Sequence, residues 1–235
     1  MLIKEKRAFI KGLVLAIGFL VVLVIMFLPL LDGDTALTAA DKLFNSISKG
    51  STNFIPDLMK KSEAYNGTAL EVNVTLKDRE MAQKVTKLFS AAGAQASGAG
   101  AQLKVKGDLG RISGAALEDS YAMFNNREAE VSSKYGFPGK EVLYLWWSAF
   151  KEVDKDLKKQ ERFKEAAFLA VVVKKGVEVG YNFYQIEPQT ARSKAGILTF
   201  SLIFYVIYTL WWGIAILFLF EGFGLQMTAG SKKEV

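Results

Sequence analysis

The side chains that most often carry out chemistry in proteins are scarce in this chain. The sequence contains no histidine and no cysteine. Without cysteine there is no disulfide, no thiolate nucleophile and no iron–sulfur ligand, and without histidine there is no imidazole base and no common zinc or copper ligand. Carboxylates remain, and they suit hard cations. We therefore predict no cofactor-binding site, no transition-metal site and no haem.

The carboxylates and glycines do not form a recognisable catalytic motif. Neighbouring acids stand at positions 118 and 119, at 128 and 130, and at 152, 154 and 156, which are mostly helix-surface spacings. The glycine-rich stretch from Gly93 to Gly110 lacks the Gly-Lys-Ser/Thr ending of a phosphate loop, and a strand pattern follows Gly98-Ala-Gly100. We predict no catalytic residue and a protein that is not an enzyme. A hydrolase that uses carboxylates alone is the least favoured alternative.

The clearest elements are two apolar runs, residues 12–31 and 195–220, which contain no charged residue. A membrane-spanning helix needs about 20 apolar residues, so each run is long enough to span a bilayer. A cleaved secretory signal peptide is the alternative for the first run. Its apolar stretch is longer than the roughly 7–15 residues of such a signal, which favours an uncleaved anchor.

Charges that flank the two runs predict the orientation of the chain. Basic residues near a span are retained in the cytoplasm, whereas a long intervening domain crosses largely regardless of its charge. The flanking basic residues at the two ends are Lys4, Lys6, Arg7, Lys11, Lys232 and Lys233. Arg192 and Lys194, just before the second run, argue the other way, but an even number of spans returns the chain to its starting side. We predict that both termini are cytoplasmic and that the domain between the spans is extracytoplasmic.

The predicted organisation has five parts in a bacterial cytoplasmic (inner) membrane. These are a cytoplasmic tail (1–11), a first transmembrane helix (12–31), a periplasmic or extracytoplasmic domain (32–194), a second transmembrane helix (195–220) and a second cytoplasmic tail (221–235). A cysteine-free domain fits a periplasm better than an animal cell surface. Half of the net charge of +6 lies in residues 1–31, and the domain between the spans carries only about +3, which argues against a nucleic-acid partner. The lipid bilayer is a predicted partner.

The middle domain shows an α+β pattern. Residues 70–76 alternate between apolar and polar side chains, as in a half-buried strand. A helix follows from Asp78 to Gly93, and residues 94–97 and 101–106 then read as a hairpin with its turn at 98–100. We therefore predict a helix-rich domain with a small three-stranded sheet, built as a strand-helix-strand-strand unit.

Helical patterns account for the rest of the domain. Residues 36–64 contain two helices divided near 50–53, and a further helix covers 114–126. From Val142 to Val171 the apolar residues keep to one side of a helix. The run 166–173 is ambiguous, because its β-branched residues also suit a strand. Residues 174–176 are expected to mark a break or kink.

Aromatic residues provide the candidates for binding. Trp147 and Leu143 lie off the apolar stripe, so they face either a partner subunit or another helix of the same domain. Tyr205 and Tyr208 fall near the middle of the second span, where a hydroxyl without a partner is costly, so we predict contact with a helix of a partner subunit. The alternative is that these tyrosines tilt toward a membrane interface. Aromatic residues expected at the membrane interface are Tyr181, Phe183, Tyr184, Trp211 and Trp212.

These observations favour a non-catalytic accessory or scaffold subunit of a multi-subunit inner-membrane assembly, for example a respiratory one, whose extracytoplasmic domain docks partner proteins. The absence of catalytic and cofactor-binding side chains is the main reason. The alternative is an extracytoplasmic ligand-sensing or adaptor protein that signals through a membrane partner. The sequence does not identify a small-molecule ligand.

Overall fold

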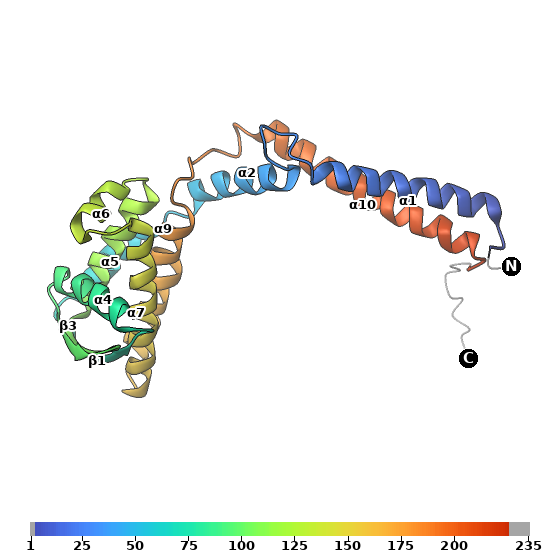
Figure 1. The fold of residues 1–235 in the computed structure, drawn as a ribbon. Helices are drawn as coiled ribbons and strands as arrows, with labels where there is room; N and C mark the ends of the chain where they lie inside the picture. The colour runs from blue at the N-terminus through green and yellow to red at the C-terminus, as the bar shows by residue number, and fades with distance from the viewer. Residues whose placement is uncertain (1–2, 226–235) are drawn as a thin grey trace, which may run out of the picture. The chain divides into compact units, whose positions relative to one another are not determined.

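The computed structural model describes residues 3–225, which are mostly helical and include one small sheet (Figure 1). The chain divides into two compact units. The first unit combines the two ends of the chain, Met1–Ile47 and Gln189–Val235, as far as they are described. The second unit is the continuous segment Ser48–Pro188.

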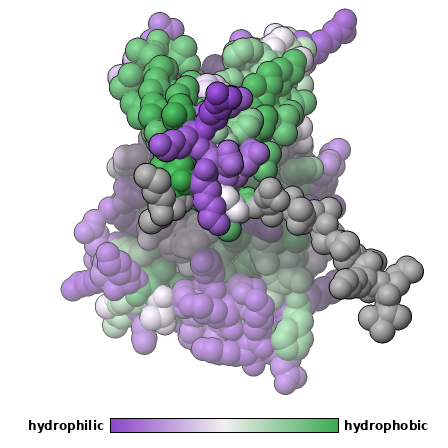
Figure 2. Space-filling view, turned by 90° about the vertical axis from the view of Figure 1, so that its right-hand side faces the viewer, coloured by the Kyte–Doolittle hydropathy of each residue, from purple (hydrophilic) through white to green (hydrophobic). Residues whose placement is uncertain are grey.

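The first unit is built on two long apolar helices, α1 (Lys6–Met26) and α10 (Ala195–Gly222). Their 21 and 28 residues make both helices long and apolar enough to cross a membrane. They lie side by side and antiparallel, because Gly12 lies against Leu219 and Gly18 against Trp211. Apolar side chains cover much of their outer surface, drawn in green in Figure 2.

Helix α1 begins before the first apolar run, and it ends at Met26, five residues before the end of that run. Pro29 accounts for the early end, since a proline disfavours helical backbone at the residue before it. Leu31 and Asp34 then form an isolated antiparallel bridge. Helix α2 (Ala36–Ser51) begins directly afterwards, where the Thr38 amide donates a hydrogen bond to the Thr35 hydroxyl.

The second unit contains an antiparallel sheet in the order β1-β3-β2, formed by β1 (Ala69–Thr75), β2 (Gln95–Ala99) and β3 (Gln102–Asp108). With α4 (Arg79–Ala91) between β1 and β2, this is the predicted strand-helix-strand-strand unit. One sheet face is buried, by alternate residues Leu70, Val72, Val74, Leu103 and Val105. The other face is polar, and there Glu71 forms ion pairs with Lys104 and Lys106.

Local sequence explains both ends of α4. The Asp78 carboxylate accepts a hydrogen bond from the Met81 amide at 2.8 Å, which satisfies a free N–H in the first turn. Gly93 follows the helix with φ +77°, a conformation that suits glycine. Val85, Leu88 and Phe89 are fully buried on the inner side of the helix. The helix predicted from Asp78 to Gly93 is confirmed, with Asp78 as its N-cap and Gly93 just after its end.

Helices form the remainder of the second unit. They are α3 (Ile55–Glu63), α5 (Leu109–Phe124), α6 (Glu128–Tyr135), α7 (Gly139–Lys159), α8 (Phe163–Val172), a π-helical turn η1 (Val173–Val177) and α9 (Glu178–Asn182). The ambiguous run 166–173 is helical, and the predicted break near 174–176 is the π-helical turn. Trp146, Phe89 and Phe150 are the bulkiest fully buried side chains of the core.

The apolar stripe after Val142 belongs to two helices instead of one. Helix α7 ends at Lys159, and α8 begins at Phe163. Glu161 takes φ +60° at the break, and the Arg162 amide donates to the Leu157 carbonyl at 2.9 Å. The Arg162 guanidinium donates to the Ala69 carbonyl of β1 at 3.0 Å. A sheet contact therefore accompanies the break that the apolar periodicity did not reveal.

Side chains at and just after the end of α7 also form hydrogen bonds with backbone groups on the outer edge of β1. Asp156 accepts a hydrogen bond from the Asn73 amide at 3.0 Å, and Gln160 donates to the Glu71 carbonyl at 2.9 Å. An open strand edge is a template for pairing with another chain. Asp156, Gln160 and Arg162 close this edge without a fourth strand.

Candidate functional site

A shallow groove in the second unit lies between α7 and the segment formed by η1 and α9. Its volume is about 300 Å³. The residues that line it are Leu143, Tyr144, Trp147, Val177, Glu178, Tyr181 and Asn182. We call this the aromatic groove. Three of its seven residues are aromatic, and Glu178 is the charged residue among them.

Close packing against α5 holds the α9 wall of the groove in place. A Cβ atom at Gly180 would lie 2.6 Å from the Ser120 carbonyl oxygen, and one at Gly176 would lie 2.5 Å from a Leu117 methyl carbon. Only glycine fits at these two positions without a shift of the backbone or of its neighbours. The π-helical turn and the two glycines thus place Glu178 and Tyr181 opposite α7.

Trp147 is at the centre of the polar contacts in the groove. Its indole N–H donates a hydrogen bond to the Glu178 carboxylate at 3.0 Å. The Tyr144 ring stacks beside it with 6.1 Å between ring centroids, and the Lys151 ammonium lies 3.8 Å from the centre of the Trp147 ring. Tyr144 is 50% exposed. The groove therefore offers a fixed aromatic surface beside a positive charge.

The two off-stripe residues have different surroundings. Leu143 is fully buried, and Gly180 of α9 packs near its side chain, so a helix of the same domain covers it. Trp147 is half-buried and in contact with the groove. A role for either residue in partner contact stays a prediction, and Trp147 is the more accessible of the two.

The three aromatics that were expected near the second span belong to the second unit. Tyr181 is exposed at the groove, whereas Phe183 packs edge-on against Phe124 with 6.1 Å between ring centroids. The Tyr184 hydroxyl donates to the Glu128 carboxylate, and this bond raises the pKa of Tyr184 above its usual value. A place for Tyr181, Phe183 and Tyr184 at a membrane interface stays a prediction.

Polar aromatics in α10 find partners on α1. The Tyr208 hydroxyl donates to the Phe19 carbonyl at 3.1 Å, and the Trp211 indole donates to the Leu15 carbonyl at 3.0 Å. Tyr208 also stacks on the Phe19 ring at 4.0 Å. The Tyr208 hydroxyl is thus satisfied within the chain, and contact of Tyr208 with a partner subunit stays a prediction. Tyr205 is 66% exposed, so it remains a candidate for contact with a second protein.

The interfacial role predicted for the tryptophans of α10 also stays open. The Trp212 ring lies 4.6 Å from the Phe19 ring, measured between centroids, although the Trp212 side chain is partly exposed. The sequence could not reveal these pairings, because backbone carbonyls of α1 are the acceptors and every helix has them.

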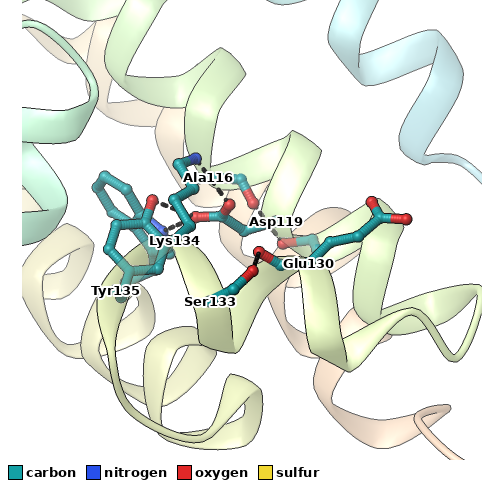
Figure 3. Close-up of polar contacts among 8 residues, drawn as sticks. Ala116, Asp119, Glu130, Ser133, Lys134 and Tyr135 are labelled. Atoms are coloured by element: carbon teal, nitrogen blue, oxygen red, sulfur yellow. Dashed lines mark hydrogen bonds and ion pairs between the residues drawn. The ribbon is translucent and has the colours of Figure 1, made fainter.

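A buried carboxylate that the sequence did not single out joins three helices of the second unit (Figure 3). Asp119 of α5 is 3% exposed. It accepts hydrogen bonds from the Tyr135 hydroxyl at 2.6 Å and from the Trp146 indole at 2.8 Å, and it pairs with the Lys134 ammonium at 3.0 Å. Burial is the main cause of a raised pKa for Tyr135, and the nearby Asp119 charge adds to it.

The Asp119 cluster is structural in character, because its hydrogen bonds join parts of the fold to one another. Acids at 118 and 119 looked like helix-surface residues, yet only Glu118 is exposed. Trp146 on the apolar stripe was the available signal, since a buried indole N–H needs an acceptor.

Among residues 3–225, no group of three acidic, histidine or cysteine side chains could hold a metal ion. Comparison of the sequence with protein-family models and with curated proteins, and of the fold with solved structures, gave no match. The aromatic groove and the two apolar helices are therefore the features that point to a function.

Proposed function

We propose that this protein is a non-catalytic accessory or scaffold subunit of a bacterial inner-membrane assembly, and that its second unit docks a partner protein through the aromatic groove. One observation carries the proposal. The same chain contains two apolar helices, each long enough to cross a membrane, and a domain that presents Tyr144, Trp147 and Tyr181 together.

The composition of the groove supports protein docking. Tryptophan and tyrosine are enriched among residues that dominate binding energy at protein interfaces. Lys151 lies over Trp147, and the Lys140 ammonium lies 5.3 Å from the centre of the Tyr181 ring. An apolar floor with lysines at its rim fits a partner segment that carries apolar residues next to acidic ones.

Backbone contacts support the proposed topology. The Lys4 and Glu5 amides both donate to the Gly222 carbonyl, at 2.9 and 3.1 Å. The start of α1 therefore lies beside the end of α10, as expected when both chain ends leave a membrane on one side. Four basic residues near the start of α1 favour the cytoplasm for that side. Lys232 and Lys233, used in the same prediction, lie outside the described residues.

Native purification in mild detergent, followed by quantitative mass spectrometry of the co-purifying proteins, tests the docking proposal. The double variant Tyr144→Ala/Trp147→Ala should lower recovery of the partner about tenfold or more, in line with the loss of interface hot spots. Phe163→Ala is the matched control, because Phe163 is also an exposed aromatic residue but lies outside the groove. Equal recovery with the double variant and the parent would contradict docking at this groove.

A second candidate function is the sensing of a small extracytoplasmic ligand. The groove volume of about 300 Å³ favours it, since this is within the range of small-molecule sites. A purified, partner-free chain that binds a metabolite in a thermal-shift screen, with binding lost in Trp147→Ala, would support sensing over docking.

A further inference from the structure

The first unit contains a second hollow, formed by the end of α1, one side of α2 and the first turns of α10. Its volume is about 600 Å³, and its lining is mainly apolar. Side chains that line it include Met26, Leu37, Leu43, Ile197, Phe200 and Phe204. We call it the α2 hollow. A cavity of this size and character fits a hydrocarbon chain.

Helix α2 is amphipathic, and its apolar side is not fully covered within the described chain. Leu37 is 48% exposed and Phe44 is 53% exposed. Asp41, Lys42 and Asn45 occupy the polar side of the same helix. A helix with one apolar and one charged side that directly follows a membrane span is typical of helices that lie at the membrane surface.

The Lys194 side chain lines the hollow and has no ion-pair partner among residues 3–225. Lys194 precedes the first residue of α10, and Arg192 is exposed two positions earlier. The Asp34 carboxylate, just before α2, is paired with Lys42 at 2.6 Å. Among residues 3–225, no acidic side chain forms an ion pair with Lys194 or Arg192. The hollow thus combines an apolar floor with unneutralised positive charge.

We propose that the α2 hollow binds an anionic phospholipid. An acyl chain lies between Leu43 of α2 and Phe200 of α10, and the lipid phosphate pairs with Lys194 and Arg192. The site is at the level where α1 ends at Met26 and α10 begins at Ala195, which is where headgroups meet hydrocarbon in a spanning topology. This inference rests on the membrane topology of the proposed function, but not on the aromatic groove.

A transmembrane helix of a partner protein could also cover an apolar hollow. The free cations favour the lipid, because a phosphate ester supplies negative charge at this depth, whereas a membrane-spanning helix is depleted of acidic residues. The two occupants give different products in a crosslinking experiment.

Binding of added lipid to the full-length chain in detergent is measured by native mass spectrometry, with phosphatidylglycerol and phosphatidylcholine as the probes. We expect preference for phosphatidylglycerol. Lys194→Gln should weaken its binding about fivefold, the effect of about 1 kcal/mol for one cation near an anionic surface. Lys42→Gln is the matched control, because Lys42 is already paired with Asp34.

A steric variant tests the position of the acyl chain. Ala40 lines the hollow, so Ala40→Phe should fill it and abolish lipid retention, whereas Thr38→Phe on the exposed side of α2 should not. Circular dichroism checks that both variants keep their helices. Equal binding of the two probe lipids, or unchanged lipid retention in Ala40→Phe, would overturn the proposal.

Photocrosslinking in intact membranes identifies the occupant in the cell. Leu43→p-benzoylphenylalanine places the reactive group in the hollow. An adduct with the mass of a phospholipid supports the proposal, and an adduct with another protein, or no adduct, overturns it. If Trp147 variants lose the partner protein but still bind lipid, the lipid site is supported independently of the aromatic groove. The two proposals can therefore be tested separately.

Discussion

At the scale of single residues, Asp119 is the position where one substitution should disturb the second unit most. Its carboxylate accepts from Tyr135 and Trp146 and pairs with Lys134. Asp119→Ala should lower the free energy of unfolding by roughly 2–6 kcal/mol, because it leaves the buried Tyr135 hydroxyl and the Trp146 indole N–H without an acceptor, at about 1–3 kcal/mol each. Denaturant unfolding of the full chain in detergent measures this change.

Glu118→Ala is the control for that substitution, because Glu118 is the neighbouring acid and is exposed. It should change the free energy of unfolding by less than about 0.5 kcal/mol. Similar losses for the two variants would mean that Asp119 does not join the helices as the hydrogen bonds indicate.

Tyr135 should make the stability of the second unit depend on alkaline pH. Burial raises its pKa in the folded chain, whereas an unfolded tyrosine ionises near pH 10. The contribution of Tyr135 is therefore complete below about pH 10 and declines as pH rises further, because only the unfolded state then loses the proton. Tyr135→Phe should flatten this part of a curve of unfolding free energy between about pH 8 and pH 11. An unchanged slope would contradict the assignment.

Residues that act on near neighbours were predictable, and residues that act across the fold were not. The Asp78 cap bonds to an amide three positions away, so its sequence pattern is local. Asp119 meets Trp146 across 27 positions, and Tyr208 meets the Phe19 carbonyl across 189. Periodicity shows that a side chain is turned inward or outward. It does not show which distant atom that side chain will bind.

At the scale of elements, the closed edge of β1 should protect the second unit from self-association. Asp156→Ala/Gln160→Ala removes two hydrogen bonds that join β1 to Asp156 of α7 and to Gln160 just after it, and should lower the free energy of unfolding by roughly 1–3 kcal/mol. It also frees backbone groups that can pair with another copy. Light scattering over a concentration series should show growth of oligomers.

Lys159→Ala on the exposed end of α7 is the comparison for the edge variant, and it should remain as monodisperse as the parent. If the double variant also remains monodisperse, Asp156 and Gln160 do not prevent self-association through the edge of β1.

Element types followed from the sequence more reliably than element ends. Alternation in β1 and helical spacing in α4 are repeated signals, and both elements are present. The break after Lys159 depends on one residue, Glu161, in a left-handed conformation and on the bond from Arg162 to β1. The aromatic groove likewise depends on a π-helical turn that brings Glu178 to Trp147, and apolar periodicity predicts no such contact.

At the scale of the whole molecule, the proposed topology makes a prediction that the cysteine-free sequence allows to be tested cleanly. A membrane-impermeant maleimide should label Ser97→Cys in intact spheroplasts, because Ser97 is exposed in the second unit. Glu5→Cys, at the start of α1, should be labelled only after the membrane is opened. Glu5 is chosen because its replacement leaves the basic residues beside the first span unchanged. The reverse labelling pattern would invert the topology.

The hydrogen bonds between α1 and α10 can form only late in the synthesis of the chain. Trp211 and the Leu15 carbonyl that it binds are 196 positions apart. At about 5–20 residues per second, the ribosome makes the two partners roughly 10–40 s apart. All of Ser48–Pro188 is made before α10, so in the proposed topology α1 is the sole anchor of the growing chain during that interval. If the proposed topology holds, the second unit has time to cross the bilayer and fold before α1 and α10 can pair, and we expect pairing of the two helices to be the last event in the assembly of the chain.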